Sequence, residues 1–396
     1  MSTILDSAIE SVQQASAAFC RFITANDTGK TGAHQAGFYI PKCASSLLFS
    51  EPGIRGENKD KMVKIQWQNS FETDSRFIYY GRGTRNEYRV TRFGRKFPFF
   101  EDDNVGDLLI ITKHSEEDYK GFVLNTDDDI ENFFSYFQLS PNESNQLIDI
   151  DNAIKPDKRI LTLFEDFVCK FNSFPETKIM AEGARNCYNQ AYRISNETLI
   201  LSPDSILLEW IDSEYNLFRC FEEKVYSYLC TTTFPTIENF IKTANEVLNR
   251  RKSRAGKSLE HHLSNIFTHN ELLFEEQAVT EDNKKPDFLF PNAECYHNWN
   301  FPTDDLTVLG AKTTCKDRWR QIVTEADRLD VKYLFTLQQG ISKNQLKEMA
   351  DSNVKLVVPQ KYLNSFPIEY RSNLLDLKSF ISMVKEKQNH NRHITI

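Results

Sequence analysis

The sequence predicts a two-domain α/β protein, in which a small β-barrel precedes a mixed sheet flanked by helices. With 396 residues, the chain is long enough to form two domains. Short alternating strands separated by turn residues fill residues 61–124, which is typical of a closed or half-closed barrel. From residue 160 onward, helical and strand patterns follow one another in an order that predicts a mixed sheet with helices on both faces.

The first domain is expected to cover residues 1–145, and the polar segment 146–159 is expected to link it to a second domain over residues 160–396. Apolar positions at helical spacing predict a helix over residues 4–24, and an acidic start predicts another over Asp127–Phe137. The expected strands are Phe38–Pro41, Met62–Trp67, Arg76–Tyr80, Glu87–Thr91, Leu108–Thr112 and Gly121–Leu124.

The second domain contains four apolar runs short enough to be strands. They are Phe288–Phe290, Leu306–Ala311, Val331–Leu337 and Val354–Val358. Helical periodicity predicts helices around them and a helical tail. The expected helices are Thr236–Arg250, Lys257–Phe267, Asp317–Leu329 and Ser342–Ala350.

Charge is unevenly distributed along the chain. The net charge of −8 argues against a protein that coats nucleic acid uniformly. Residues 76–96, however, contain seven basic residues and one acidic residue, and residues 250–257 contain five basic residues and no acidic residue. Two basic segments in an acidic protein favour a local DNA-binding surface. Either segment alone is also compatible with an ordinary solvated basic face.

Several other classes of protein are excluded by their missing signals. The eight cysteines form no C-x-x-C pair and no His-linked zinc spacing, so we expect reduced thiols of a cytosolic protein. We expect no membrane span and no secretion signal, because no apolar run is long enough and the N-terminus lacks the required pattern. Gly29-Lys30-Thr31 and Gly256-Lys257-Ser258 lack the preceding glycine of a nucleotide-binding loop.

The candidate active site begins with Asp287 and Lys312. Asp287 comes directly before the strand Phe288–Phe290, and Lys312 ends the next strand. Residues at these positions can meet at one end of a sheet. A carboxylate is a hard oxygen ligand for a metal ion, and a fixed cation can hold an attacking water or a developing phosphate charge. The pair therefore indicates metal-dependent cleavage of a phosphodiester, although such a pair on its own is weak support.

Two glutamates strengthen that interpretation. Glu325 and Glu260 each lie beside an apolar helical stripe, where an unpaired carboxylate is costly. Taken individually, each is better explained as a flanking residue that reaches water. Because both are expected at the same end of the sheet as Asp287 and Lys312, they favour an Mg²⁺ site. Two or three of the carboxylates would hold the metal, and Lys312 would orient the water.

Lys316, Asp317 and Arg318 follow the catalytic candidates, at the expected start of a helix. Arg and Lys pair with guanine O6 and N7, and Asp accepts from cytosine N4, so the triplet could recognise G·C pairs. An ordinary charged first helical turn explains the same residues equally well, since Asp is favourable at a helix start. Both interpretations stay open at this point.

Five longer motifs resemble one family. PDFLFP, AKTTCKDRWRQI and NRRKSRAGKSLE closely resemble the EcoRII family of type II (IIE) restriction endonucleases, within the PD-(D/E)XK nuclease superfamily. ANDTGKTGAHQAGFYIP and TRNEYRVTRFGR resemble the effector-DNA-binding pseudobarrel of that family, so the resemblance covers both domains. It implies a homodimeric, Mg²⁺-dependent enzyme of the prokaryotic cytoplasm. Such an enzyme cuts both DNA strands at a short C·G-flanked site, leaves 5′-phosphates, and is blocked by its barrel until a second DNA site binds.

The resemblance also assigns residues. In this group the acid that usually precedes the motif lysine is displaced onto the following helix, which matches Gly310 here and Glu325 thirteen residues after Lys312. The loop Thr31–Gln35 and the strand Thr84–Arg95 would grip effector DNA, with alternate residues of the strand sharing a face. His34 alone would more often be a turn residue. The effector-DNA candidates are Thr31, His34, Gln35, Arg85, Asn86, Glu87, Arg89 and Arg92.

Two departures from the family pattern limit what is carried over. Tyr88 stands where the family has a lysine in the second DNA-binding arm. The segment Glu209–Glu214 lacks the arginine cluster that lies near the family's pocket for the central base. We therefore expect the outer base pairs of the site to be recognised as in the family, and the central position to differ.

Two other functions are compatible with parts of the sequence. Tyr296 follows the Asp287 strand in a polar loop, so a DNA strand transferase with a covalent tyrosine nucleophile is conceivable. A DNA-binding regulator on an inactive nuclease scaffold is the second alternative. The intact set Asp287, Lys312 and Glu325 argues against it.

Overall fold

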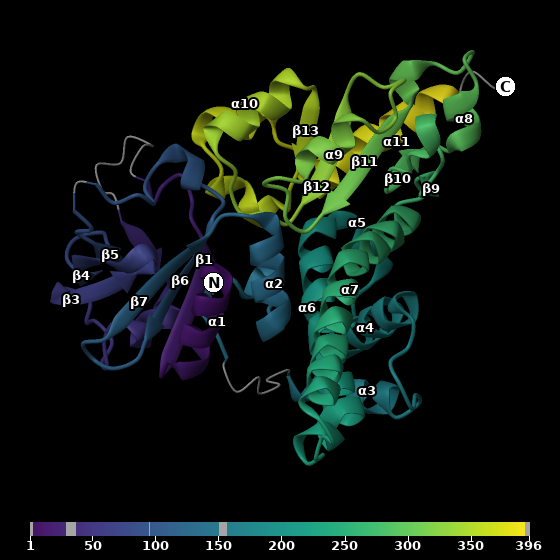
Figure 1. The fold of residues 1–396 in the computed structure, drawn as a ribbon. Helices are drawn as coiled ribbons and strands as arrows, with labels where there is room; N and C mark the ends of the chain where they lie inside the picture. The colour runs from purple at the N-terminus through teal and green to yellow at the C-terminus, as the bar shows by residue number, and fades with distance from the viewer. Residues whose placement is uncertain (1–2, 29–36, 95, 150–156, 393–396) are drawn as a thin grey trace. The chain divides into compact units, whose positions relative to one another are not determined.

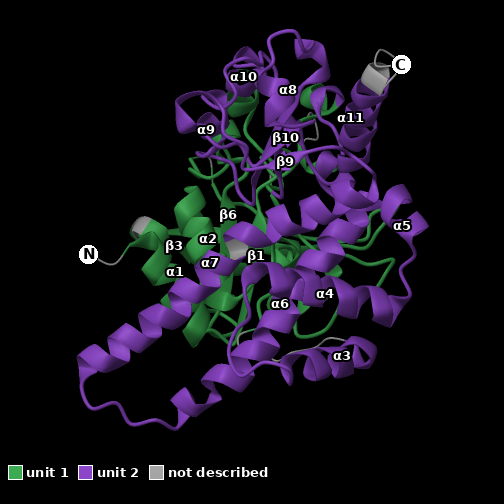
Figure 2. Ribbon diagram, turned by 90° about the vertical axis from the view of Figure 1, so that its right-hand side faces the viewer, with its two compact units in different colours: residues 1–153, 338–347, 364–371 green, residues 154–337, 348–363, 372–396 purple. Residues whose placement is uncertain are grey.

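The computed structural model describes residues 3–28, 37–94, 96–149 and 157–392. Figure 1 shows the order of the helices and strands along the chain. The chain divides into two compact units, which Figure 2 distinguishes by colour. Unit 1 comprises residues 1–153, 338–347 and 364–371, and unit 2 comprises residues 154–337, 348–363 and 372–396. None of the described helices is long and apolar enough to span a bilayer.

Unit 1 is built on an eight-stranded sheet with the order β2-β5-β4-β3-β7-β6-β1-β8. Neighbouring strands are antiparallel except β3 and β7, which are parallel. The strands are β1 (Ala17–Phe22), β2 (Phe38–Ile40), β3 (Lys59–Trp67), β4 (Phe71–Tyr80), β5 (Glu87–Thr91), β6 (Leu108–Lys113), β7 (Tyr119–Leu124) and β8 (Gln146–Leu147).

The sheet of unit 1 curls around one apolar core and carries a second core on its other face. In β6, Leu109 and Ile111 belong to the inner core, whereas Leu108 and Ile110 belong to the outer one. The helices α1 (Ile4–Gln14) and α2 (Asp127–Phe137) cover the outer face. A strand buried on both faces reads as a nearly continuous apolar run, which explains the four successive apolar residues 108–111 of β6. The predicted barrel-like sheet is confirmed.

The expected helix over residues 4–24 is wrong in its second half. α1 ends at Gln14, and Ala17–Phe22 forms the central strand β1. Phe19 faces the inner core while Ala18 and Cys20 face the outer core, so residues 17–20 are apolar without interruption and have no diagnostic period. β8 lies inside the segment that was expected to be a linker, where it pairs with β1.

Unit 2 begins with five helices. They are α3 (Lys158–Val168), α4 (Thr177–Tyr192), α5 (Asn196–Leu201), α6 (Pro203–Tyr226) and α7 (Ile237–His269). α7 is one helix of 33 residues, so the two separate helices expected there are wrong. The apolar pattern lapses over residues 250–257 because arginines replace apolar residues as the side chains that pack on α6. Arg254 is buried against the rings of Tyr215 and Phe218.

A five-stranded mixed sheet follows, with the order β13-β12-β11-β10-β9. β11, β12 and β13 are parallel, while β10 is antiparallel to both of its neighbours, which confirms the predicted mixed sheet. The strands are β9 (Glu275–Glu276), β10 (Phe288–Phe290), β11 (Thr307–Lys312), β12 (Lys332–Thr336) and β13 (Val354–Val357). The remaining helices are α8 (Ala293–His297), α9 (Trp319–Val323), α10 (Lys343–Asp351) and α11 (Leu377–Arg392).

Helices cover both faces of this sheet, as predicted. Phe288 and Phe290 of β10 contact Phe267 of α7, and Phe290 also contacts Phe380 of α11. Leu289 faces the opposite side, where its core cluster includes Tyr296 of α8. The expected helix over residues 317–329 is too long, since α9 spans only residues 319–323.

Candidate active site

Asp287 and Lys312 meet at one end of the five-stranded sheet, as the sequence predicted. The antiparallel register pairs Phe288 with Leu309, which places the start of β10 beside the end of β11. Asp287 Oδ2 accepts a hydrogen bond from the main-chain N–H of Ala311 at 2.7 Å and one from Lys312 Nζ at 3.2 Å. Asp287 is 9% exposed and Lys312 is half-buried. The pair is therefore partly shielded from solvent, which strengthens its electrostatic interaction.

Glu260 of α7 and Glu325 lie in the field of this pair. Burial and, to a smaller extent, the charge of Asp287 raise the pKa of Glu325 to about 7, although Lys312 partly offsets them. The pKa of Glu260 is also raised to about 7, and the same three influences are the largest there. Both glutamates are half-buried. Glu260 and Glu325 are thus each coupled electrostatically to the Asp287–Lys312 pair.

The position of Glu325 follows from the packing of α9 on β11. A Cβ atom at Gly310, the position where the related motif carries an acid, would lie 2.8 Å from Ile322 Cδ1 of α9. A side chain at residue 310 therefore competes with α9 for the same space. After α9 the chain turns at Ala326, which has the left-handed φ of 50°. Glu325 thus lies on the segment that follows α9, where the sequence predicted the displaced acid.

The segment after Glu325 is held by a buried tyrosine. The Tyr296 hydroxyl donates to the Glu281 carboxylate at 2.6 Å and accepts from the main-chain N–H of Arg328 at 3.2 Å. Glu281 also accepts from the main-chain N–H of Asp327 at 3.1 Å. Tyr296 is 2% exposed, and its pKa is raised by burial and by Glu281. The alternative of a tyrosine nucleophile is therefore wrong, because this hydroxyl is inaccessible and supports the site instead.

The donor set is compatible with a hard divalent cation. Among the described residues, no three His, Cys, Asp or Glu side chains converge closely enough to form a complete metal site. Mg²⁺ does not require such a set, because it keeps several waters and binds one or two carboxylates together with substrate phosphates. Asp287 and Glu325, with Glu260 nearby, supply oxygen ligands of the required type, and nitrogen and sulfur ligands are not needed.

Comparison with known proteins identifies the family. Residues 12–143 match the family model described as restriction endonuclease EcoRII, N-terminal, and residues 218–381 match the model described as EcoRII C terminal. The chain is 36% identical over 387 residues to the type II restriction enzyme EcoRII of Escherichia coli, which covers 92% of this chain and 93% of that enzyme. The chain belongs to the EcoRII family of type II restriction endonucleases. It is accordingly a site-specific DNA endonuclease.

Solved structures of two other restriction endonucleases are more distant. Metal-depleted Ecl18kI in complex with uncleaved, modified DNA is 17% identical, with a TM-score of 0.46 over 57% of this chain and 84% of that chain. The complex of PspGI with substrate DNA is 16% identical, with a TM-score of 0.46 over 55% of this chain and 94% of that chain.

The expected base-recognition residues lie in the turn between β11 and α9. Asp317 is exposed, Arg318 is half-buried at the start of α9, and Lys316 is 8% exposed. In this EcoRII-family chain the turn follows Lys312 after only three residues, so base recognition and catalysis would be close together. The burial of Lys316 makes Asp317 and Arg318 the more accessible members of the triplet.

The second basic segment is used partly for internal packing. Arg251 forms a two-pronged ion pair with Glu222 of α6, at 2.8 and 2.9 Å. Arg250 lies over the ring of Phe174 and donates to the Tyr226 hydroxyl at 3.0 Å. Three of the five basic residues therefore have structural partners, counting the buried Arg254. The interpretation of this segment as a continuous DNA-binding surface is too broad.

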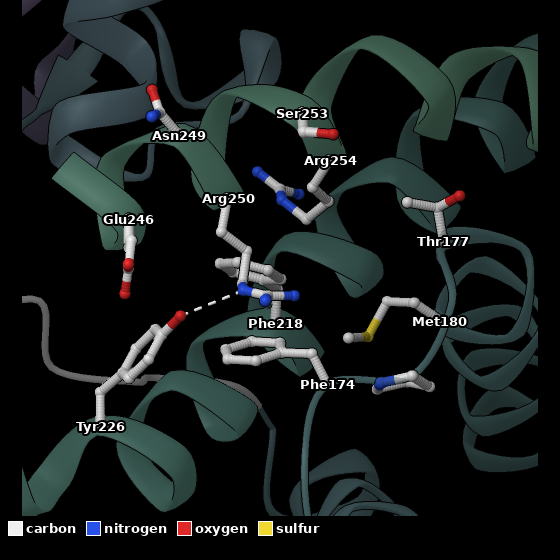
Figure 3. A pocket seen from close by; sticks show the side chains of 11 residues that line it. Phe174, Thr177, Met180, Phe218, Tyr226, Glu246, Asn249, Arg250, Ser253 and Arg254 are labelled. Atoms are coloured by element: carbon white, nitrogen blue, oxygen red, sulfur yellow. Dashed lines mark hydrogen bonds between the residues drawn. The ribbon is translucent and has the colours of Figure 1, made fainter. Parts of the chain in front are cut away.

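Arg250 and Arg254 line a pocket of about 440 Å³ between helices α4, α6 and α7 (Figure 3). Figure 3 shows the rings of Phe174, Phe218 and Tyr226 grouped around Arg250 and Arg254. None of the proposed catalytic residues lines this pocket. Nothing in the sequence indicated this pocket, because the wall of the pocket combines residues from a loop and three helices.

The effector-DNA candidates in unit 1 are only partly visible. Thr31, His34 and Gln35 lie outside the described residues. Glu87 and Arg89 share the half-buried face of β5 and form an ion pair at 3.2 Å, which agrees with the expected alternation. Arg92 follows the strand with a left-handed φ of 65°, so the alternation does not extend to it.

The residues that flank β5 make local contacts. Arg85 lies over the ring of Tyr80 at 5.2 Å, and the Asn86 amide oxygen accepts from the Tyr79 hydroxyl at 2.9 Å. Tyr88, which replaces the family lysine, is 3% exposed, and its hydroxyl accepts from the main-chain N–H of Gly53 at 2.7 Å. Tyr88 therefore belongs to the core of the barrel.

The structure adds one polar contact of Asp287 that the sequence did not predict. Gln277, directly after β9, donates from Nε2 to Asp287 Oδ1 at 3.0 Å. No motif, periodicity or charge pattern marks a glutamine in a loop, so the sequence carried no signal for it. The contact depends on the pairing of β9 with β10.

Proposed function

We propose that this endonuclease hydrolyses both strands of double-stranded DNA at a short C·G-flanked site, leaving 5′-phosphates. The observation that carries the proposal is the contact between Asp287 and Lys312, with Glu325 and Glu260 in their field. Lys312 would hold the nucleophilic water or stabilise the phosphate charge, and Asp287 would keep its ammonium in place. Asp287 and Glu325, and Glu260 with them, would hold Mg²⁺. When bound, the metal would supply Lewis-acid activation of the scissile phosphate.

The proposal is tested by incubating the full chain with unmethylated genomic DNA, with and without Mg²⁺, and sequencing the cut ends. Discrete double-strand breaks with 5′-phosphates are expected only with Mg²⁺. Specific binding without any cleavage would favour the alternative of a DNA-binding regulator. A protein–DNA adduct that survives denaturation would revive a covalent mechanism.

A second copy of the chain is the proposed partner, since each chain has one such site and a duplex has two strands. The N-terminal part of α7 carries an apolar stripe at helical spacing: Ile237, Phe240, Ile241, Ala244, Val247 and Leu248. Ile237, Phe240 and Ile241 are 72%, 54% and 51% exposed. Such a stripe is typical of a helix that packs on a partner. Sedimentation should detect a dimer that Phe240→Glu weakens, whereas Leu201→Glu on α5, which is 53% exposed, should not.

Unit 1 is the proposed control element. The EcoRII-family match over residues 12–143 and the partly exposed Glu87–Arg89 face of β5 support binding of a second DNA site there. Bound DNA can relieve inhibition only if it binds the released state more tightly. We propose that the enzyme acts on DNA in the cytoplasm of a prokaryotic cell.

A further inference from the structure

The geometry points to Gln277 as a positioning residue for the Asp287 carboxylate, an inference that rests on the proposed function. Its main-chain N–H donates to the carbonyl oxygen of Asp287 at 3.2 Å, and its side-chain Nε2 donates to Asp287 Oδ1 at 3.0 Å. One residue thus holds both the backbone and the side chain of the aspartate. A carboxylate only accepts hydrogen bonds, so the amide of Gln277 must present its NH₂ group to it.

The three contacts on Asp287 divide between its two oxygens. Ala311 N–H and Lys312 Nζ bind Oδ2, while Gln277 binds Oδ1. The contacts on Oδ2 alone leave the carboxylate free to turn about that oxygen. Donors on both oxygens fix the plane of the group, and hydrogen bonds behind a metal ligand orient it for the metal in this way.

The backbone at Gln277 also requires explanation. β9 ends at Glu276, and Gln277 then adopts a left-handed φ of 53°. Glycine and asparagine adopt that conformation more readily than glutamine does. If residue 277 served only to make the turn, either of those residues would serve better. The turn alone does not account for glutamine at this position, whereas the contact between its long amide side chain and Asp287 does.

This difference separates a positioning role from a structural one. Gln277→Gly and Gln277→Asn relieve the backbone conformation but cannot reach Oδ1, so their melting temperatures should equal or exceed that of the wild type. Their cleavage rates should nevertheless fall by about 10- to 100-fold, and the Mg²⁺ concentration for half-maximal rate should rise. Gln277→Glu keeps the length but replaces the donor with a second negative charge, so it should be impaired at least as strongly.

The experiment uses the full chain with cognate duplex. Mn²⁺ binding is titrated by the loss of the free-ion electron paramagnetic resonance signal, and single-turnover cleavage and thermal melting are measured on the same preparations. Val279→Ala, an exposed position in the same loop, is the matched control and should behave as the wild type. DNA binding in Ca²⁺ should be unchanged in all variants.

Different results would contradict the role of Gln277 and the proposed function of the site. Wild-type Mn²⁺ affinity and wild-type cleavage in Gln277→Gly and Gln277→Asn would overturn the inference and reduce Gln277 to a turn residue. Cleavage by Asp287→Ala at the wild-type rate would instead overturn the proposed function. In that case, equally weakened Mn²⁺ binding by Gln277→Gly and by Asp287→Ala would still establish that Gln277 positions Asp287.

Discussion

The ends of β10 and β11 in unit 2 and the face of β5 in unit 1 both present charged residues on a sheet, but in different surroundings. At the end of β10 and β11, Asp287 and Lys312 are shielded, and burial raises the pKa of Glu325 to about 7. On β5, the Arg89–Glu87 pair lies on the outer side of a strand whose other side belongs to the barrel core. Shielded, mutually repelling carboxylates suit metal binding and catalysis, whereas charges along a strand suit contact with a DNA backbone.

The largest expected effect is loss of catalysis at the shielded site. Asp287→Ala, Lys312→Ala and Glu325→Ala should each reduce single-turnover cleavage by about 10³-fold or more, because each would remove a proposed metal ligand or the proposed cation at the reacting phosphate. Binding to cognate duplex in Ca²⁺ should persist, since the proposed base contacts are made by other side chains. Glu294→Ala on the exposed side of α8 is the control. Near-normal cleavage by Glu325→Ala would mean that another carboxylate serves in its place.

The next effect concerns base recognition beside that site. Arg318→Ala should lose about 1–3 kcal/mol of discrimination at one guanine, as expected for a bidentate contact to its O6 and N7. Competition binding with duplexes substituted at single positions measures this. Equal weakening of binding to cognate and random DNA would make Arg318 a contact to the DNA backbone. The turn before α9 would then bind DNA in the same way as is proposed for the charged face of β5.

The pH dependence should distinguish the two regions. Glu260 and Glu325 have an ordinary pKa of 4.5 that is raised to about 7, so the folded, metal-free protein keeps protons that the unfolded chain has lost. Their contribution to the free energy of unfolding therefore falls as the pH rises from 4.5 to 7. In the folded protein the two glutamates ionise around pH 7, and metal binding requires their ionised form. Cleavage at subsaturating Mg²⁺ should be about tenfold slower at pH 6 than at pH 8.

Thermal melting provides the control for this prediction. Without metal, the melting temperature should be lower at pH 8 than at pH 5.5, and Mg²⁺ should raise it more at pH 8. Glu325→Gln, which cannot ionise, should show a smaller pH dependence. A pH-independent response to Mg²⁺ would separate these glutamates from the metal site.

The smallest effect is expected on β5. Arg89→Ala should reduce the stimulation of one-site plasmid cleavage by an added cognate duplex by about two- to fivefold, since a single phosphate contact contributes little on its own. Cleavage without the added duplex should not fall. Initial rates on one-site and two-site plasmids measure the difference. Unchanged stimulation would place the effector contact elsewhere in unit 1.

Hydrophobic periodicity and capping residues were sufficient to predict helices and strands that have one buried and one exposed face. β5 and α2 have the predicted bounds, because β5 alternates and α2 starts with three acids and a capping threonine. The strand Phe288–Phe290 was also found, since aromatic residues in a short run indicate a half-buried or buried strand. Patterns failed where both faces are buried, as in β1, and where arginines replace apolar residues, as in α7.

From the sequence alone, Asp287, Lys312, Glu325 and Glu260 could be selected, because residue type and the position of a charge relative to strands and apolar stripes are local properties. The tertiary structure alone decided their geometry. The antiparallel register of β10 and β11 brings the aspartate to the lysine, and Ile322 packs against Gly310, so that the acid is supplied from beyond α9. The structure also revealed the hydrogen bonds that Tyr296 makes to the segment after Glu325 and that Gln277 makes to Asp287. Hydrogen bonds between residues brought together only by strand pairing leave no period, charge run or spacing in a sequence.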